Sequence, residues 1–248
     1  MRPTALIGHT GFIGGNLARQ FAFDECYNSK NIPSIRGKEF FRIVCGGVSA
    51  VKWWANQNPA EDRAKIDELL ADLATVKAGK MIVLSTVDVY PVVSGVDESF
   101  DCHSQPNHAY GTNRLYFEDS LKQMFADVLI LRISGVFGPG LKKNVIYDLI
   151  HDNQLNVINP DSSFQYYNVG NLWRDLAVIE TQGLDVVNLV NEPVLTSTIV
   201  ERLFPGKLVG ANPMAEAHYD IHTLHSASGP YRCTAEEVLR ELGDFIAQ

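Results

Sequence analysis

Three glycines near the N-terminus have the spacing of a loop that can hold a phosphate group. Gly8, Gly11 and Gly14 form a G-x-x-G-x-x-G pattern after the apolar run 5–7, and apolar residues at helical spacing follow. A strand, a glycine turn and a helix in this order present backbone N–H groups to a phosphate. A tight turn with close helix packing is the alternative, and the flanking strand and helix favour the phosphate site. The expected contacts to a nucleotide cofactor are Gly8, Thr10, Gly11, Phe12, Ile13 and Gly14.

A second group of polar side chains falls where later strands end and a helix begins. Ser85 and Thr86 follow the apolar run 81–84. Tyr110 begins a helical pattern, and Arg114 lies one turn further along the same helix face. Ligands of open α/β sheets bind outside the carboxyl ends of the strands. These side chains are therefore candidates for contact with a ligand.

The elements that must position these residues alternate along the chain. The apolar runs predict strands and the 3.6-residue patterns predict helices, which together favour an α/β fold with a doubly wound parallel sheet, Rossmann-like. The predicted strands are 4–8, 26–28, 41–47, 81–84 and 128–133, and the predicted helices are 14–24, one opened by Asn58-Pro59, and 109–124. After residue 140 the alternation of strands and helices is less regular. The predicted helices there are near 145–151, 172–181 and 196–204, and the predicted strands are near 156–158 and 186–190. A last helix begins with a capping box at Thr234 and Glu237.

The same pattern divides the chain into two regions. Residues 1–135 form the expected nucleotide-binding core, with its last strands open to contribution from 136–248. Residues 136–248 form a small interleaved region on the substrate side.

Four segments resemble a known family when they are taken in order. They are 8–14, Ser85–Tyr90, Tyr110–Arg114 and Arg132–Pro139. This set resembles the extended short-chain dehydrogenase/reductases, the NAD-dependent epimerase/dehydratase group, over about residues 1–140. The resemblance implies an NAD(P)-dependent oxidoreductase or epimerase-like enzyme. Its substrate would carry a hydroxyl or carbonyl group on the reacting carbon, and a small sugar-derived compound is one candidate.

The resemblance also implies catalytic roles for three residues. Tyr110 matches the family's catalytic acid and base, and Thr86 matches the residue that hydrogen-bonds the reacting oxygen. Arg114 stands at the family's lysine position. A phenol has an ordinary pKa near 10, which must approach neutrality for efficient proton exchange. A nearby cation favours the phenolate, and we expect Arg114 to act in this way.

The sequence departs from the family pattern at three positions. An arginine cannot lose a proton, so Arg114 cannot relay one. Gly135 stands where nucleotide-sugar enzymes usually have asparagine, and Gln165 stands near the position of a phosphate-binding arginine. Two usual contacts to a nucleoside diphosphate sugar are thus missing. A second hypothesis follows from Arg114: an NAD(P)-binding redox sensor or scaffold without turnover.

The expected cofactor is NADP, with NAD as the alternative. An acidic residue after the second strand would bind the ribose 2′-hydroxyl of NAD. Asn28-Ser29-Lys30 follows that strand and holds no acid, so Ser29 and Lys30 can meet a 2′-phosphate. An exposed polar turn is the alternative interpretation. Gly46, Gly47 and Ser85 complete the expected cofactor contacts.

Composition excludes several classes of partner. The 248 residues carry a net charge of −8, which argues against non-specific nucleic-acid binding. No apolar run reaches membrane-spanning length, and the first strand begins too early for a signal peptide. The four cysteines form no C-x-x-C pair, which favours reduced thiols in a cytoplasmic protein. The expected partner is a small-molecule substrate, and the assembly considered is a homodimer.

Other histidines and tryptophans have simpler interpretations. His218, His222 and His225 have a spacing that could bind a metal on a helix, but Asp220-Ile221 and Ser226–Pro230 argue against a helix there. We therefore predict no metal. Trp53 and Trp54 could cover a ligand, and packing against the Asn58 helix is the commoner use. His103 and His108 lie before Tyr110 as pocket or solvated loop residues.

Overall fold

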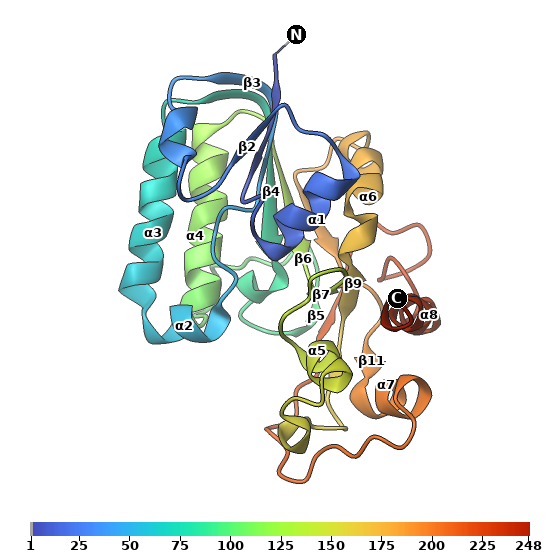
Figure 1. The fold of residues 1–248 in the computed structure, drawn as a ribbon. Coiled ribbons are helices and arrows are strands. Elements are labelled where there is room, and N and C mark those ends of the chain that lie inside the picture. The colour runs from blue at the N-terminus through green and yellow to red at the C-terminus, as the bar shows by residue number, and fades with distance from the viewer. Residues whose placement is uncertain (1) are drawn as a thin grey trace. The chain divides into compact units, whose positions relative to one another are not determined.

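The computed structural model describes residues 2–248 and contains a six-stranded sheet (Figure 1). Its strand order is β10-β6-β4-β3-β1-β2. The strands are β1 (Thr4–Ile7), β2 (Glu25–Tyr27), β3 (Glu39–Cys45), β4 (Lys77–Thr86), β6 (Val128–Ile133) and β10 (Val186–Leu189). The pairings from β2 through β1, β3 and β4 to β6 are parallel, as the apolar runs predict. The doubly wound α/β fold is confirmed.

The strand order reverses between β1 and β3, and this reversal determines where a ligand can bind. From β1 the chain first adds β2 on one side and then crosses to add β3 on the other. The crossover carries only the 3₁₀ helix η1 (Ile32–Ile35). Such a reversal is a topological switch point, and ligands bind outside the carboxyl ends of the strands there. Gly8 follows β1 and Gly46 follows β3, so both lie at this edge.

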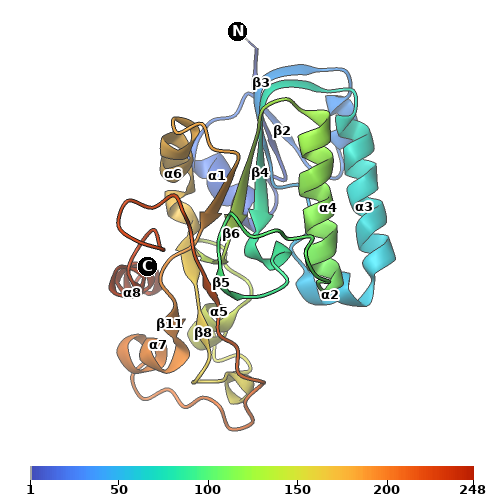
Figure 2. The same ribbon diagram turned by 180° about the vertical axis from the view of Figure 1, so that it is seen from behind.

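Helices cover both faces of this sheet (Figures 1 and 2). On one face lie α1 (Phe12–Gln20) and α6 (Leu172–Glu180). On the other lie α2 (Lys52–Gln57), α3 (Pro59–Leu73) and α4 (Ala109–Met124). Pro59 takes the first helical position of α3, where its missing N–H is no loss, and acidic residues follow in the first turn. The apolar stripe of α3 packs on the sheet through Ile66, Leu69, Leu70 and Leu73.

The chain divides into two compact units. The first contains residues up to 92, 99–133 and 170–187, and the second contains 93–98, 134–169 and 188–248. The first unit thus takes α6 and the start of β10 from late in the chain. No helix within residues 2–248 is long and apolar enough to cross a membrane.

Short strand pairs and three helices build the second unit. β7 (Gly135–Phe137) pairs with β9 (Tyr166–Asn168), β8 (Ser163–Phe164) with β11 (Val194–Leu195), and β5 (Ser94–Val96) with β12 (Asp220–Ile221). The helices are α5 (Val145–Ile150), α7 (Thr196–Leu203) and α8 (Ala235–Ile246). Their apolar faces share a core that includes Phe137, Ile146, Ile199, Val238 and Leu242.

Local patterns predicted some ends of these elements and missed others. The capping box of α8 is formed, with both the Thr234 and the Glu237 side chains bonded to backbone N–H groups. The predicted strand near 156–158 is wrong, because Leu155–Val157 forms the 3₁₀ helix η3 after Gln154 adopts a left-handed backbone. The helix α2 has no counterpart in the prediction, since neither a capping side chain nor an apolar stripe marks its six residues.

Candidate active site

The glycine loop after β1 is closed so tightly that two of its positions require glycine. Gly8 has a φ of +88°, and a Cβ there would lie 2.3 Å from the carbonyl oxygen of Gly46. A Cβ on Gly14 would lie 2.3 Å from the carbonyl oxygen of Gly8. Gly11 is the N-cap of α1, and no side chain caps this helix. The backbone N–H groups at the start of α1 are therefore suited to bind an anionic group.

Gly46 and Gly47, two of the other expected cofactor residues, adjoin this loop. Gly46 donates its N–H to Ile7 at 2.9 Å, and Gly47 follows beside the side chain of Ile7. The hydroxyl of Ser85, a third expected residue, donates to the carboxylate of Glu118 in α4. The Ser85 side chain is thus bound to a buried acid.

Ser29 and Lys30 lie in an exposed turn beside the glycine loop. Gly8 donates its N–H to the carbonyl of Tyr27 at 2.8 Å, which joins the loop to the end of β2. The next three residues form a turn in which Lys30 N–H donates to Oδ1 of Asn28 at 2.9 Å. Both Ser29 and Lys30 are exposed. Their place next to the glycine loop allows a contact to the ribose of an adenosine. The turn is also stabilised by its own hydrogen bond between Lys30 and Asn28.

Tyr110 is held at the start of α4 by three neighbouring segments. Its backbone N–H donates to Oδ1 of Asn56 in α2 at 2.9 Å. The N-cap is His108, whose Nδ1 accepts the N–H of Gly111 at 2.9 Å. A Cβ on Gly111 would lie 2.2 Å from the carbonyl oxygen of Asp88, so α4 and the loop after β4 are in direct backbone contact.

Thr86 caps that loop. Its Oγ1 accepts the N–H of Asp88 at 3.1 Å and so begins the 3₁₀ helix η2 (Val87–Val89). Asn107 fixes the same loop by donating to the carbonyl of Asp88 at 2.9 Å. Because Asp88 bonds Thr86 on one side and packs against Gly111 on the other, Thr86 and the start of α4 are held together.

Arg114 is part of a buried ion pair that sequence analysis did not anticipate. Its guanidinium donates to both carboxylate oxygens of Asp62 in α3, at 2.8 and 3.0 Å, and to the carbonyl of Ser49. Both side chains are at most 5% exposed. Burial alone would raise the pKa of Asp62, but the bonds from Arg114 and Asn113 outweigh it and hold that pKa below its ordinary value. The charge of Arg114 is therefore balanced within the α3–α4 pair.

Arg114 acts on the pKa of Tyr110 in the expected direction, and burial acts against it more strongly. The guanidinium carbon lies 4.3 Å from the centroid of the Tyr110 ring, on its face. Burial raises the pKa of Tyr110, and Asp88 raises it too, while the charges of Arg114 and Lys52 lower it. The net pKa of Tyr110 lies above the ordinary value, because burial outweighs the charge of Arg114.

Three residues of this site escaped sequence analysis, although a signal existed for two of them. Asp62 lies on the apolar stripe of α3, four residues before Ile66, and Glu118 lies on the face of α4 that carries Tyr110 and Arg114. An acid on an apolar helix face predicts a buried partner. Lys52, in the unpredicted helix α2, lies 2.7 Å from the carboxylate of Asp88.

Gly135 and Gln165, which both depart from the family pattern, are in close contact within the second unit. A Cβ on Gly135 would lie 2.9 Å from the carbonyl oxygen of Gln165, so a larger residue at 135 would displace β9. The Gln165 amide donates to the carbonyls of Asn191 and Ile221 and accepts the N–H of Ile221, at 2.8 to 2.9 Å. These bonds connect Gln165 to two other segments of the second unit, so its side chain has a structural role there.

The other candidate histidines and the tryptophan Trp54 have partners of their own. His218 contacts Glu216 and Ser163, and His222 contacts Asp220. Among the described residues no group of three or more His, Cys, Asp or Glu side chains could hold a metal ion. His103 pairs with Asp119. Trp53 is 64% exposed, and Trp54 packs under the ammonium of Lys65.

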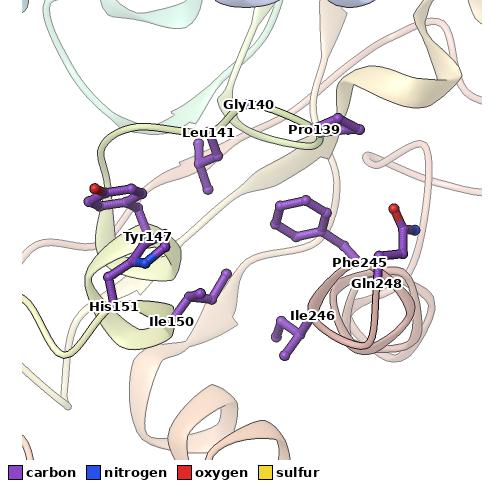
Figure 3. Close-up of a pocket in the computed structure, with 9 residues that line it drawn as sticks. All are labelled: Pro139, Gly140, Leu141, Tyr147, Ile150, His151, Phe245, Ile246 and Gln248. Atoms are coloured by element: carbon purple, nitrogen blue, oxygen red, sulfur yellow. The ribbon is translucent and has the colours of Figure 1, made fainter.

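A cavity in the second unit holds none of the predicted site residues. It has a volume of 390 Å³ and lies between α5 and the end of α8 (Figure 3). Tyr147 and His151 line one side, with ring centroids 4.3 Å apart, and Phe245 lines the other. Its walls are mainly apolar, so it lacks the convergent polar groups of a catalytic site.

Comparisons with solved structures agree with this fold. The chain is similar to a dTDP-4-dehydrorhamnose reductase from Yersinia enterocolitica, with 12% identity, a TM-score of 0.73, and coverage of 100% of this chain and 99% of that one. It is similar to a UDP-glucuronic acid 4-epimerase from Bacillus cereus, solved with a UDP-sugar and NAD, with 16% identity, a TM-score of 0.73 and coverage of 99% of each chain. An NAD-dependent NDP-hexosamine 5,6-dehydratase involved in tunicamycin biosynthesis gives 17% identity and a TM-score of 0.73, with coverage of 98% and 91%. At these identities the likeness is one of fold.

Sequence comparison identifies the family. No curated protein sequence matches the chain. The model of the NAD dependent epimerase/dehydratase family matches residues 41–188, more than half of the chain. This range includes Thr86, Tyr110 and Arg114, while the glycine loop precedes it. The chain therefore belongs to the NAD dependent epimerase/dehydratase family, a family of enzymes of the short-chain dehydrogenase/reductase type.

Proposed function

We propose that the protein catalyses NAD(P)-dependent oxidation or reduction at a carbon that bears a hydroxyl or carbonyl group. The observation that carries this proposal is the joint placement of Thr86 and the start of α4 through Asp88, at the carboxyl end of β4. Tyr110 exchanges a proton with the reacting oxygen. Thr86 hydrogen-bonds the same oxygen and orients it. Arg114 acts on Tyr110 by stacking on its ring, which fixes the direction of the phenol.

The residues of the glycine loop fit a dinucleotide. The tight approach of Gly14 to Gly8 and the uncapped start of α1 suit a pyrophosphate, and Gly46 and Gly47 adjoin them across the switch point. A nicotinamide group, when bound, supplies hydride transfer. We propose NADP over NAD, because the exposed Lys30 stands beside the loop where a 2′-phosphate would lie.

The proposed substrate is a small compound, with sugar-derived alcohols and ketones as the first candidates. Two proteins of similar fold, the dTDP-4-dehydrorhamnose reductase and the UDP-glucuronic acid 4-epimerase, act on sugar nucleotides. Gly135 and Gln165 stand where the family resemblance implies an asparagine and a phosphate-binding arginine, and both are engaged in packing within the second unit. These two observations favour a sugar-derived substrate with fewer diphosphate contacts.

One observation favours a second function, cofactor binding without turnover. The charge of Arg114 is balanced by Asp62, and burial holds the pKa of Tyr110 above its ordinary value. A protein with such a phenol could bind a nicotinamide cofactor as a redox sensor. This hypothesis predicts cofactor binding with no turnover of any substrate.

The experiment that separates the two functions compares wild type with Tyr110→Phe. Aldehydes, ketones, sugars and sugar nucleotides are offered with NADPH, NADH or the oxidised forms, and nicotinamide absorbance is followed. The enzyme hypothesis predicts a loss of turnover of about a hundred- to ten-thousand-fold in Tyr110→Phe, because a general acid–base group is removed. Cofactor affinity, measured by calorimetry, should stay unchanged. Equal turnover in both proteins would remove Tyr110 from the mechanism.

A further inference from the structure

The helix α4, which carries Tyr110, begins at a histidine whose capping bond depends on its protonation state. His108 is the N-cap, and its Nδ1 accepts the N–H of Gly111 at 2.9 Å. An imidazole nitrogen that accepts a hydrogen bond carries no proton, so the neutral ring has its proton on Nε2. The preferred N-cap residues are serine, threonine, aspartate and asparagine, and none of them gains a positive charge in acid. The capping bond of α4 exists only while His108 is neutral.

The first turn of α4 depends on this capping bond. Gly111 must be glycine, because a Cβ there would lie 2.2 Å from the carbonyl oxygen of Asp88. Glycine is a poor helix former, since it has more backbone freedom to lose on folding than any other residue. The capping bond therefore supports the residue of this turn with the lowest helix propensity. Tyr110 directly precedes Gly111, and its N–H donates to Oδ1 of Asn56 at 2.9 Å. The two bonds together fix the backbone of Tyr110.

Charged groups from two other elements act on the His108 ring. Partial burial of the ring lowers its pKa, and the charge of Lys52 in α2 lowers it too, while Asp88 in η2 raises it. On α4 itself, the centroid of the Tyr110 ring lies 6.2 Å from that of His108. The positive end of the helix dipole also disfavours a charged ring at this position. His108 is an exposed residue, so protons from water can reach it.

We propose that His108 is a positioning residue for Tyr110, which it holds in place by capping α4 in its neutral form and releases when acid protonates Nδ1. The incoming proton comes from water and takes the lone pair that accepts the N–H of Gly111. The imidazolium then lies at the positive end of the helix dipole, which adds repulsion to the lost bond. The inference rests on the proposed function, since it makes the position of the proton-exchanging residue depend on pH.

The test measures the capping bond in the full-length protein by NMR. Nitrogen-15 shifts of the His108 ring show which nitrogen carries the proton, and amide hydrogen exchange, taken relative to the intrinsic rate at each pH, gives the protection of Gly111 and Tyr110. At about pH 7.5, Nδ1 should be unprotonated. The folded-state pKa of His108 lies below the unfolded value of about 6.5. As the pH falls through the folded-state pKa, both protections should fall together by about five- to thirtyfold.

Three variants separate the cap from other effects of acid. His108→Asn supplies a capping side chain that does not titrate, so the protection of Gly111 should stay constant over the same pH range. His108→Ala removes the cap, so the low protection should be present already at neutral pH. His103→Asn is the matched control, because His103 lies in the same loop and pairs with Asp119. This control should behave like wild type.

Other results overturn the proposal. They are a proton on Nδ1 of His108 at neutral pH, an equal loss of Gly111 protection in wild type and His108→Asn, and a Tyr110 amide whose protection does not follow that of Gly111. A pH profile of turnover gives a second readout, in which His108→Asn should extend the acidic limb of kcat to lower pH. Equal acidic limbs in the two proteins would contradict the positioning role. The NMR measurements need no substrate, so absence of turnover would contradict the proposed function alone.

Discussion

The effect of a substitution at residue 114 depends on the side chains around it. A lysine there would keep the charge but could not form the two parallel bonds that Arg114 makes to Asp62. Family resemblance alone suggests that lysine would restore the usual function. The geometry indicates the opposite, because Arg114→Lys would leave a buried carboxylate with fewer donors. Arginine and lysine are not interchangeable at a bidentate site.

The substitution Gly14→Ala, which adds one methyl group, tests whether the glycine loop binds the cofactor. Gly14→Ala should abolish saturable cofactor binding, because its Cβ would lie 2.3 Å from backbone and must open the loop. The control is Gly243→Ala, which adds the same methyl group to a helix interior with only an ordinary contact of 3.5 Å to Leu203. The control should retain cofactor affinity and gain up to about 1 kcal/mol of stability from helix propensity. Calorimetric titration with NADPH measures the first effect, and thermal unfolding measures the second. Equal affinity in Gly14→Ala and wild type would place the cofactor elsewhere.

At the scale of elements, the Asp62–Arg114 pair joins α3 to α4. Asp62→Asn should lower the free energy of unfolding by about 3–5 kcal/mol, because it leaves a buried guanidinium without its counter-charge. Glu39→Gln is the control, since it breaks only exposed pairs, with Arg2 and Lys77, and should change stability little. Urea unfolding at neutral pH measures both. A small effect in Asp62→Asn would show that the pair is compensated by other contacts.

The same pair predicts a dependence on pH. The folded-state pKa of Asp62 lies below its ordinary value. Its contribution to stability is therefore complete above the unfolded pKa, about 4, and is lost as the pH falls through the folded pKa. Wild type should lose stability on acidification more steeply than Asp62→Asn. Parallel curves for the two proteins would contradict the lowered pKa.

The elements also show what the sequence could and could not predict. The strands of the sheet, α4 and the capping box of α8 follow from apolar periodicity and local capping residues. The helix α2 does not, because its six residues are placed by contacts to α3 and α4. The orientation of Ser85 depends on Glu118, which lies 33 positions away in the sequence. The partners of catalytic side chains thus depend on tertiary packing that a local pattern does not contain.

At the scale of the whole chain, the strand order explains why distant segments share one edge. The reversal between β1 and β3 brings the ends of these strands together, so Gly8 and Gly46 touch although they are far apart in the sequence. The adjacent β4 ends at Thr86 on the same edge. Alternating strands and helices predict this edge in general terms. Periodicity alone does not predict that β1 lies between β2 and β3. The connection from β2 to β3 contains only the 3₁₀ helix η1 and no α-helix.

Linkage between cofactor binding and folding offers a test of NADP preference. A ligand at a hundredfold excess over its Kd stabilises the folded state by about 2.7 kcal/mol, which corresponds to a rise in Tm of roughly 5–11 °C for a chain of this size. NADPH should raise the Tm more than NADH at equal concentration. Because Lys30 is exposed, its contact to a 2′-phosphate should favour NADPH by no more than about fivefold in Kd.

Lys30→Glu should remove this difference, since it replaces the cation beside the glycine loop with a repelling charge. Lys122→Glu in α4 is the matched control, because it makes the same change of net charge at another exposed position. Thermal unfolding with each cofactor, together with Kd values at two salt concentrations, measures the effect. The preference of wild type should weaken at high salt, as expected for an exposed charge contact. An NADH preference in wild type, or a loss of NADPH preference that is equal in Lys122→Glu, would assign the choice of cofactor to residues other than Lys30.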